Sequence, residues 1–254
     1  MSLVDDNMLT KVNEKLVAIV GFYDGSAGQV EAWFENVTGL EIACFVIDAD
    51  DFVEVNIEEE NRKRVCQSTD FPRNGFFKGH PLLVSSNWIE LILDMGVRKV
   101  LCLDPDNRRR LAHIELIQKR GLQLMSAIHP SVLMMPGSDI ADGVWINAGC
   151  IIGYKAEIRP GAIINTGVQI DHHNVLEECC QVDPGVITAG NVVLRRCCHI
   201  HTGAILINRV EIGENSVIGA GAVVLKDVPA SCTAVGVPAR VVKRDGPGPN
   251  LCRA

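Results

Sequence analysis

The feature that most constrains the fold is a six-residue repeat in the second half of the chain. Steps of six from Ile128 to Val224 visit seventeen positions, of which sixteen are aliphatic. Neither an α-helix, with about 3.6 residues per turn, nor a β-strand, with alternation every two residues, produces this period. Six-residue faces that close a triangular coil do produce it. The repeat therefore predicts a left-handed parallel β-helix of hexapeptide repeats. The seventeen positions are Ile128, Met134, Ile140, Ile146, Ile152, Ile158, Ile164, Ile170, Leu176, Val182, Thr188, Leu194, Ile200, Leu206, Ile212, Ile218 and Val224.

A mostly small residue comes four positions after each of these aliphatic residues. Cys150, Cys180 and Cys198 occupy this second slot, as Ala156 and Ala162 do elsewhere. We expect it to point into the coil, where only a small side chain fits, so these three cysteines are predicted to be core thiols.

Residues 18 apart are expected to stack, because one coil of three faces has 18 residues. Neighbouring coils then lie about 4.8 Å apart, the spacing of strands in any sheet. This register places Gln181 beneath His199 and Asp183 beneath His201.

The first half of the chain follows a different pattern. A buried strand over Leu16–Gly21 runs into the glycine-bearing turn FYDGSAG, a helix over QVEAWFENVT follows, and a second buried strand, Glu41–Asp48, ends in an acid. Further helices alternate with strands up to LQLMSAI, which predicts a small parallel sheet, α/β and Rossmann-like. We expect three parts: a Rossmann-like nucleotide-sugar-binding domain over residues 1–125, the β-helix over 126–245 and a C-terminal tail over 246–254.

The turn after the first strand is where such sheets bind phosphate or nucleotide. Gly21, Gly25 and Gly28 give G-x-x-x-G-x-x-G instead of the usual G-x-G-x-x-G. Asp48 stands where a contact with the ribose or base is expected. The alternative is that these glycines only make a tight turn.

Composition excludes several classes of protein. The net charge of −7 argues against a broad nucleic-acid surface. No apolar run approaches the roughly 20 residues that span a bilayer, and no signal-peptide pattern is present, so we expect a cytoplasmic protein without a membrane span. The ten cysteines include no C-x-x-C pair, which favours free thiols. A zinc site formed by Cys179/Cys180 and Cys197/Cys198 remains an alternative to the prediction of no metal.

These segments together resemble a known family. IVGFYDGSAGQV, FVID, DNRRRLAHIELIQKRG, AIHPSVLM, INTGVQIDHHN and IGAGAVVLKDVPASCTAVGVPARVVK occur in the same order in hexapeptide-repeat N-acetyltransferases that act on nucleotide-linked 4-amino sugars, and in O-acetyltransferase relatives of the sialic-acid pathway. The resemblance covers about Leu16 to Arg244. It implies acetyl-CoA as co-substrate and a homotrimer.

The resemblance also implies roles for individual residues. The family's catalytic base is the histidine of I-[DE]-H-[DE], which falls on His172. A neutral imidazole suits the removal of a proton from an attacking amine. Where the family has an acid after this histidine, the chain has His173, so Asp171 or an acid of another chain is a candidate for that role.

Other positions that match family contacts lie along the whole chain. Gln181 replaces a second histidine that donates to the acyl carbonyl, and its amide can still donate; His199 is an alternative donor. The matching cofactor-binding positions are Gln181, Gly190, Thr202 and Ala220. The matching nucleotide-sugar-binding positions are Gly25, Ser26, Ala27 and Asp48.

The predicted function is acetyl-CoA-dependent N-acetylation of a nucleotide-linked amino sugar, by direct attack with His172 as general base. Three alternatives stay open: sugar O-acetylation, a zinc enzyme like the β-helix carbonic anhydrases, and an inactive sugar-nucleotide-binding trimer. The four histidines between residues 172 and 201 motivate the second, and the departures at His173 and Gln181 motivate the third.

Overall fold

The computed structural model describes residues 12–22, 24–51 and 75–244. These residues divide into two compact units, with the division between Val100 and Leu101. The two-residue strands that recur every six residues begin later, at Ala127. The domain limits drawn from the sequence therefore stay a prediction. Within the described ranges, no helix combines the length and the apolar character needed to cross a membrane.

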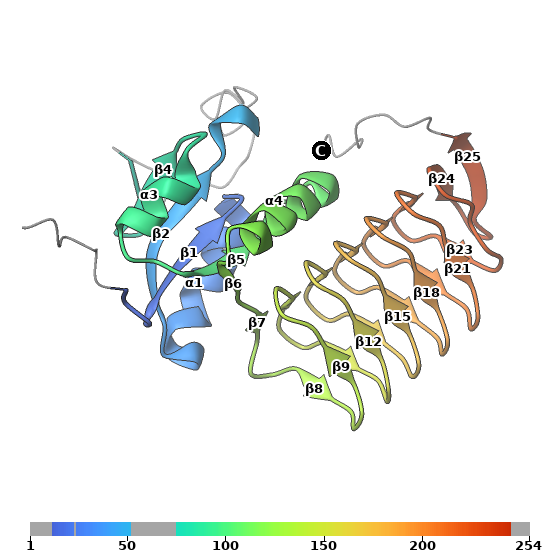
Figure 1. The fold of residues 1–254 in the computed structure, drawn as a ribbon. Helices are drawn as coiled ribbons and strands as arrows, with labels where there is room; N and C mark the ends of the chain where they lie inside the picture. The colour runs from blue at the N-terminus through green and yellow to red at the C-terminus, as the bar shows by residue number, and fades with distance from the viewer. Residues whose placement is uncertain (1–11, 23, 52–74, 245–254) are drawn as a thin grey trace, which may run out of the picture. The chain divides into compact units, whose positions relative to one another are not determined.

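The first unit is a small α/β fold (Figure 1). Its elements are β1 (Leu16–Val20), α1 (Asp24–Thr38), β2 (Glu41–Ile47), a 3-10 helix (Ala49–Asp51), β3 (Phe76–Phe77), β4 (His80–Val84) and α3 (Trp88–Asp94), and β5 (Lys99–Cys102) crosses the division between the units. Strand β2 pairs in parallel with both β1 and β4, as the alternation of strands and helices predicts.

Two local features of this unit differ from the sequence-based expectation. Strand β3 pairs antiparallel with β4, so the sheet is mixed and not purely parallel. Helix α1 begins at Asp24, so Gly25 lies in its first turn and not in the predicted loop. Gly21, which follows β1, has a φ of 85° and makes the sharp turn that glycine permits.

The second unit is a parallel β-helix preceded by one helix and one short strand, α4 (Asn107–Lys119) and β6 (Gln123–Leu124). Figure 1 shows its strands stacked in rows. Each strand is two residues long and starts six residues after the last. The strands β7 to β23 are Ala127–Ile128, Leu133–Met134, Asp139–Ile140, Trp145–Ile146, Ile151–Ile152, Glu157–Ile158, Ile163–Ile164, Gln169–Ile170, Val175–Leu176, Gln181–Val182, Ile187–Thr188, Val193–Leu194, His199–Ile200, Ile205–Leu206, Glu211–Ile212, Val217–Ile218 and Val223–Val224.

The strands form three faces. The first face contains β7, β10, β13, β16, β19 and β22, and β24 (Cys232–Val235) and β25 (Arg240–Arg244) extend it. The second, which we call the groove face, contains β8, β11, β14, β17, β20 and β23, and the third contains β9, β12, β15, β18 and β21. All strands from β7 to β23 pair in parallel at a spacing of 18 residues. The predicted stacking of Gln181 beneath His199 is confirmed.

The six-residue repeat supplies the core. From Ile146 to Val224 the second residue of each strand is buried, and the small residue four positions later is buried too. Cys150, Cys180 and Cys198 lie in this core, as predicted. Met134 is 40% exposed because it belongs to the first coil, which no complete coil covers.

Helix α4 is attached to the β-helix by buried polar groups. Asp106 caps its first turn by accepting from the backbone N–H of Arg108 and Arg109. The guanidinium of Arg110 is fully buried and donates to the carbonyls of Gly161 and Cys179 at 2.8 and 2.9 Å. Such a buried charge is stable only with its hydrogen bonds satisfied, so the helix is held in one register along this corner of the coil.

Candidate active site

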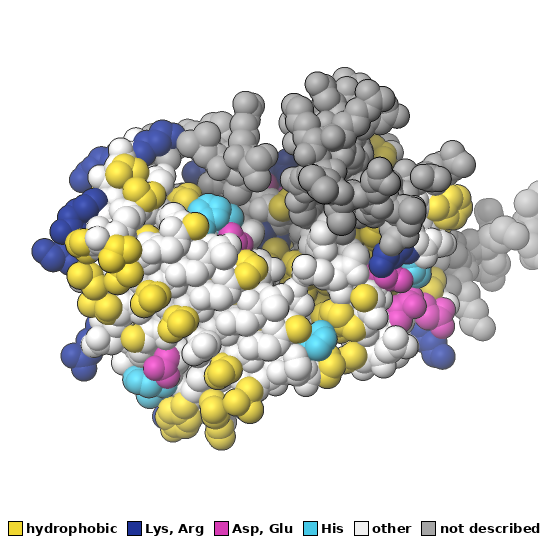
Figure 2. All heavy atoms as spheres, turned by 180° about the vertical axis from the view of Figure 1, so that it is seen from behind, with side chains coloured by type: hydrophobic (Ala, Val, Ile, Leu, Met, Phe, Trp, Pro, Cys, Tyr) yellow, Lys and Arg dark blue, Asp and Glu magenta, His cyan; other side chains and the backbone are white. Residues whose placement is uncertain are grey.

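The candidate site lies along the groove face. A groove of about 770 Å³ is lined by outward-facing apolar residues, among them Ile151, Ile187 and Ile205, and by His172 at its edge. These three isoleucines are 37%, 40% and 42% exposed, although strands normally keep such residues covered. Figure 2 shows exposed apolar side chains over the β-helix, with histidine and acidic side chains beside them.

The turn that carries His172 joins the groove face to the third face. Strand β14 ends at Ile170, and the turn runs over 171–174 before β15 begins. The carboxylate of Asp171 accepts the backbone N–H of His172 at 2.7 Å. Asp171 therefore orders the backbone of the turn and does not contact the imidazole in this arrangement.

Glycines above and below make room for this turn. A Cβ at Gly190, in the next coil, would overlap the imidazole of His172, with Nδ1 only 2.8 Å away. A Cβ at Gly153, in the coil before, would lie 2.6 Å from the backbone nitrogen of His172. The resemblance assigns Gly190 to cofactor binding. In the structure, the imidazole of His172 also packs against Gly190.

His172 and His173 are paired through their side chains. Their Nδ1 atoms are 3.0 Å apart, and the rings meet edge to face at 5.2 Å between centroids. Since one Nδ1 must donate and the other accept, two tautomer assignments exist. If His172 donates, its Nε2 keeps a free lone pair, which is the form a general base needs. His173 adopts a left-handed backbone conformation, with φ of 56°, and also packs edge-on against Tyr154.

Thr188, the one position that breaks the aliphatic repeat, uses its hydroxyl to support the turn that carries His172. It stacks on Ile170 in the neighbouring coil. Its Oγ1 accepts from the backbone N–H of Asp171 at 3.2 Å and from the side-chain amide of Asn174 at 2.5 Å. Asn174 is fully buried in the small-residue slot, and its Oδ1 accepts the backbone N–H of Val192. This buried pair ties both ends of the His172 turn to the next coil.

The remaining predicted cofactor positions follow the opposite edge of the groove face. Thr202 and Ala220 are exposed residues in the turns after β19 and β22, which join the first face to the groove face. The carbonyl of Thr202 accepts the backbone N–H of Gly221. The predicted cofactor residues Gly190, Thr202 and Ala220 therefore lie along the two edges of one face.

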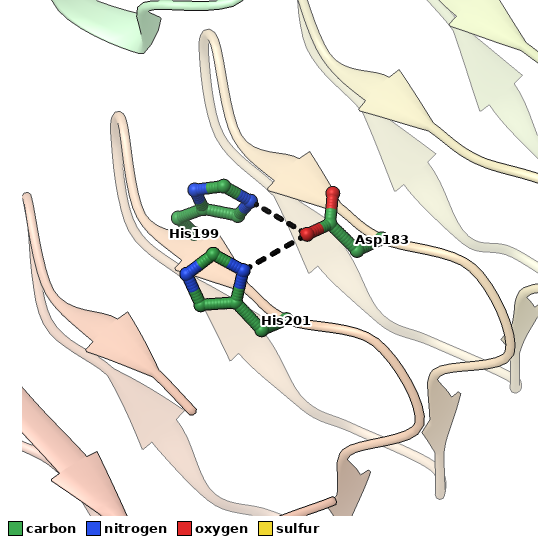
Figure 3. A group of neighbouring side chains, drawn as sticks. All are labelled: Asp183, His199 and His201. Carbon is green, nitrogen blue, oxygen red and sulfur yellow. Dashed lines mark hydrogen bonds and ion pairs between the residues drawn. The ribbon is translucent and has the colours of Figure 1, made fainter. Parts of the chain in front are cut away.

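Gln181 lies on the first face, near the edge occupied by Thr202. Its amide nitrogen donates to Oδ1 of Asp183 at 3.1 Å. Asp183 also contacts His199 and His201, and the three form a compact cluster (Figure 3). Burial opposes ionisation of Asp183, but hydrogen bonds from the two imidazoles outweigh it and hold the pKa of this carboxyl well below its ordinary value.

The nucleotide-binding candidates occur in the first unit. Gly25 and Ser26 lie in the first turn of α1, and Ala27 is 1% exposed, so its side chain packs in the core and offers no surface to a ligand. Asp48 follows β2. Its Oδ2 accepts the indole N–H of Trp88 at 2.9 Å and its Oδ1 accepts the backbone N–H of Asp50. The contact with Trp88 fixes the orientation of the carboxylate.

The paired cysteines do not form a common cluster. Cys180 and Cys198 face each other inside the coil, with sulfur atoms 3.6 Å apart. Cys179 and Cys197 lie at the corner next to α4, and burial raises their pKa values to about 11 and about 12. Within the described part of the chain, the group of three or more metal-ligating side chains that does come together is Asp183, His199 and His201.

Sequence reasoning therefore singled out the turn that carries His172 but missed the buried residues that support it. Asn174 and Thr188 occupy repeat positions where the pattern predicts apolar residues. Their polarity was the sequence signal that could have identified them as supports of the turn. The stacking of Asp183 beneath His201 was predicted, but the convergence of His199 on the same oxygen depends on side-chain rotamers.

No protein-family model and no curated protein sequence matches the chain. Solved structures do match. A mutant perosamine N-acetyltransferase from Caulobacter crescentus, crystallised with CoA and GDP-perosamine, has a TM-score of 0.76 and 27% identity, over 92% of this chain and 99% of that chain.

Two further structures share the fold. The acetyltransferase domain of PglB from Neisseria gonorrhoeae, in complex with acetyl coenzyme A, has a TM-score of 0.74 and 22% identity over 91% of this chain and 100% of that chain. WeeI from Acinetobacter baumannii has a TM-score of 0.60 and 18% identity, over 89% of this chain and 100% of that chain. The chain therefore shares its left-handed β-helix with these structures, and over most of its length it is similar to a nucleotide-sugar N-acetyltransferase of the hexapeptide-repeat family.

Proposed function

We propose that the protein transfers the acetyl group of acetyl-CoA to the amine of a nucleotide-linked amino sugar. The observation that carries the proposal is the His172 imidazole, seated over Gly190 at the edge of an apolar groove and oriented by His173. The perosamine enzyme, which is similar over nearly its whole length, binds CoA and GDP-perosamine. The same two classes of ligand suit this chain.

The reaction is a direct displacement. The amine nitrogen attacks the thioester carbonyl while Nε2 of His172 removes a proton from the nitrogen. The tetrahedral intermediate then collapses, the carbon–sulfur bond breaks, and the imidazolium returns a proton to the CoA sulfur. The products are the amide and free CoA. Holding both substrates in one complex supplies much of the rate, because the bimolecular step becomes effectively intramolecular.

His173 takes the place of the family's acid in this scheme. Its Nδ1 accepts from Nδ1 of His172, which fixes the tautomer and leaves the Nε2 lone pair for the amine. A neutral imidazole stabilises the developing imidazolium less than a carboxylate does. We therefore expect a slower enzyme than one with an acid at this position, and not an inactive one.

The first unit is proposed to hold the nucleotide. The N-terminus of α1, with the backbone of Gly25, Ser26 and Ala27, offers N–H groups and a positive dipole end to phosphate. Asp48, held by Trp88, is proposed to contact the ribose or base.

A homotrimer completes the site in this proposal. Within one chain Gln181 lies on the first face, whereas His172 lies at the far edge of the groove face. The two can serve one acyl group only if they come from different copies of the chain. The exposed isoleucines of the groove face suit burial between subunits. The cytoplasm is the proposed location, since the eight described cysteines are free thiols and acetyl-CoA is the co-substrate.

The test is product detection by mass spectrometry. The protein is mixed with acetyl-CoA and a panel of GDP-, UDP- and CMP-linked amino sugars, and matched hydroxyl sugars test O-acetylation. We expect the mass of one acetyl group on one amino sugar, and its loss with His172→Ala. Transfer only to hydroxyl sugars would favour the O-acetyltransferase alternative. Absence of transfer to any sugar would refute the proposal.

A further inference from the structure

We propose that Asp183, His199 and His201 form a binding site for one divalent transition-metal ion, with zinc as the best fit. Nε2 of His199 and Nδ1 of His201 each lie 3.0 Å from the same oxygen, Oδ2 of Asp183 (Figure 3). The three ligand atoms all lie within 4.8 Å of one another. The reaction scheme proposed above gives Asp183 and His201 no step, and His172 of the same chain lies at the other edge of the groove face.

The fold itself brings the three residues together. Strand β19 stacks on β16 with Ile200 over Val182, and both of these residues point into the core. His199 and His201 flank Ile200, so the alternation of a strand turns both imidazoles outward on the same side. Asp183 follows Val182 in the coil before and meets them there. The rings lie 4.0 Å apart between centroids.

The carboxylate is oriented by its neighbours. Oδ1 of Asp183 accepts from the amides of Gln181 at 3.1 Å and Asn165 at 3.3 Å, which turns Oδ2 toward the imidazoles. Hydrogen bonds to the far oxygen of a carboxylate are the outer support that metal ligands usually have. A purely structural contact between two histidines and an acid does not need both oxygens fixed in this way.

The chemistry of the three groups selects the ion. Two imidazole nitrogens and one carboxylate oxygen are a common zinc ligand set, with bonds of about 2.0–2.2 Å. Ligand atoms on one tetrahedral ion then lie about 3.4 Å apart, so small side-chain rotations from the observed separations admit the ion. His199 is nearly buried, with 6% of its side chain exposed, but His201 is 35% exposed and leaves a path for entry.

The experiment is a metal titration of the full-length protein. The protein is treated with a chelator, dialysed, and titrated with Zn²⁺ in competition with a chromophoric chelator, and metal content is measured by mass spectrometry. We expect one ion per chain. Asp183→Asn and His201→Gln should each weaken binding at least tenfold. His129→Gln is the matched control, because His129 occupies the same column of the β-helix, with its Nδ1 2.8 Å from the hydroxyl of Ser131.

Two outcomes overturn the proposal. One is binding of less than one ion per chain, and the other is stoichiometric binding that both variants keep unchanged. Co²⁺ substitution separates this site from the cysteines, since thiolate ligands give an intense near-ultraviolet band and histidine and carboxylate ligands do not. A thiolate band would place the ion elsewhere and contradict the proposal. Circular dichroism of each metal-free variant checks that it folds, and the part-exposed His201 makes His201→Gln the safer of the two.

Discussion

The imidazole of His172 stands over Gly190 of the next coil, where a Cβ atom would overlap the ring. Gly190 is not one of the glycines with a positive φ, so its backbone conformation does not require glycine. The absence of a side chain at Gly190 instead leaves room for the imidazole of His172. A side chain at position 190 should therefore displace the imidazole of His172 without straining the backbone.

Gly190→Ala is therefore expected to lower kcat by about 10²-fold, because a catalytic group displaced by about 1 Å commonly loses that much rate. Thermal unfolding should change little, since the exposed imidazole can swing outward. In a His172→Ala background the second substitution should cost almost nothing, as the ring is already gone. Equal losses in both backgrounds would show that Gly190 acts on something other than His172.

Gly153→Ala provides the contrast. A Cβ there meets the backbone of Asp171, 2.5 Å away, and the backbone of His172, neither of which can move aside like a side chain. We expect this variant to lose stability by about 1–3 kcal/mol, the usual cost of overpacking, measured as the shift in the urea midpoint. A midpoint equal to that of Gly190→Ala would contradict the distinction.

His173→Asp is expected to increase the rate. The left-handed backbone at this position tolerates Asp better than most residues. A carboxylate beside Nδ1 would stabilise the imidazolium of His172 more than the present imidazole does. The acidic limb of the kcat profile should then move to higher pH, with a several-fold rise in kcat at pH 8. His173→Asn, which fits the same backbone without a charge, is the control, and a similar rise there would exclude the charge effect.

Thr188→Val removes the acceptor for the buried amide of Asn174 and for the N–H of Asp171. A buried donor left without a partner costs about 1–3 kcal/mol, so the free energy of unfolding should fall by that amount. The looser turn should also lower kcat with little change in KM. Thr188→Ser keeps the hydroxyl and should preserve kcat. If the valine variant were as stable and active as the wild type, the Asn174–Thr188 pair would have no such role.

Buried thiols predict a loss of stability in alkali. Burial raises the pKa of Cys102 to about 12, whereas an unfolded thiol titrates near 8.5. Because the folded pKa is the higher one, the stabilisation is complete below about pH 8.5 and is lost as pH rises toward 12. The free energy of unfolding should therefore decrease above about pH 9, more steeply in the wild type than in Cys102→Ala. Identical slopes in the two proteins would contradict the burial effect.

The sequence was most informative where the fold repeats. Each strand of the β-helix ends on the residue that the six-residue steps pick out, because a coil of constant size forces inward positions to recur. The pattern could not predict that β3 pairs antiparallel with β4, since Phe76 and Phe77 form a strand too short to show a period. It also placed Gly25 in a loop, because glycine weakens helix propensity, although the residue lies within α1.

The places of the candidate site residues in the fold were predictable, but their contacts were not. His172 could be placed on a turn from IDHHN alone. Asp171 accepts the backbone N–H of His172, and His173 pairs with the imidazole of His172. These contacts depend on side-chain rotamers, which the six-residue repeat does not determine. Thr188 stood out as an exception, but its function became clear only when Asn174 was seen beside it.

The measurement that tests the central claim most directly is the pH dependence of kcat for wild type and His172→Asn. It uses isotopically labelled acetyl-CoA and the amino sugar that the product assay identifies. We expect a wild-type rate that rises with pH as the base loses its proton, and a variant rate at least 10²-fold lower without that rise. A variant that keeps the wild-type rate and profile would contradict the assignment of His172 as the base.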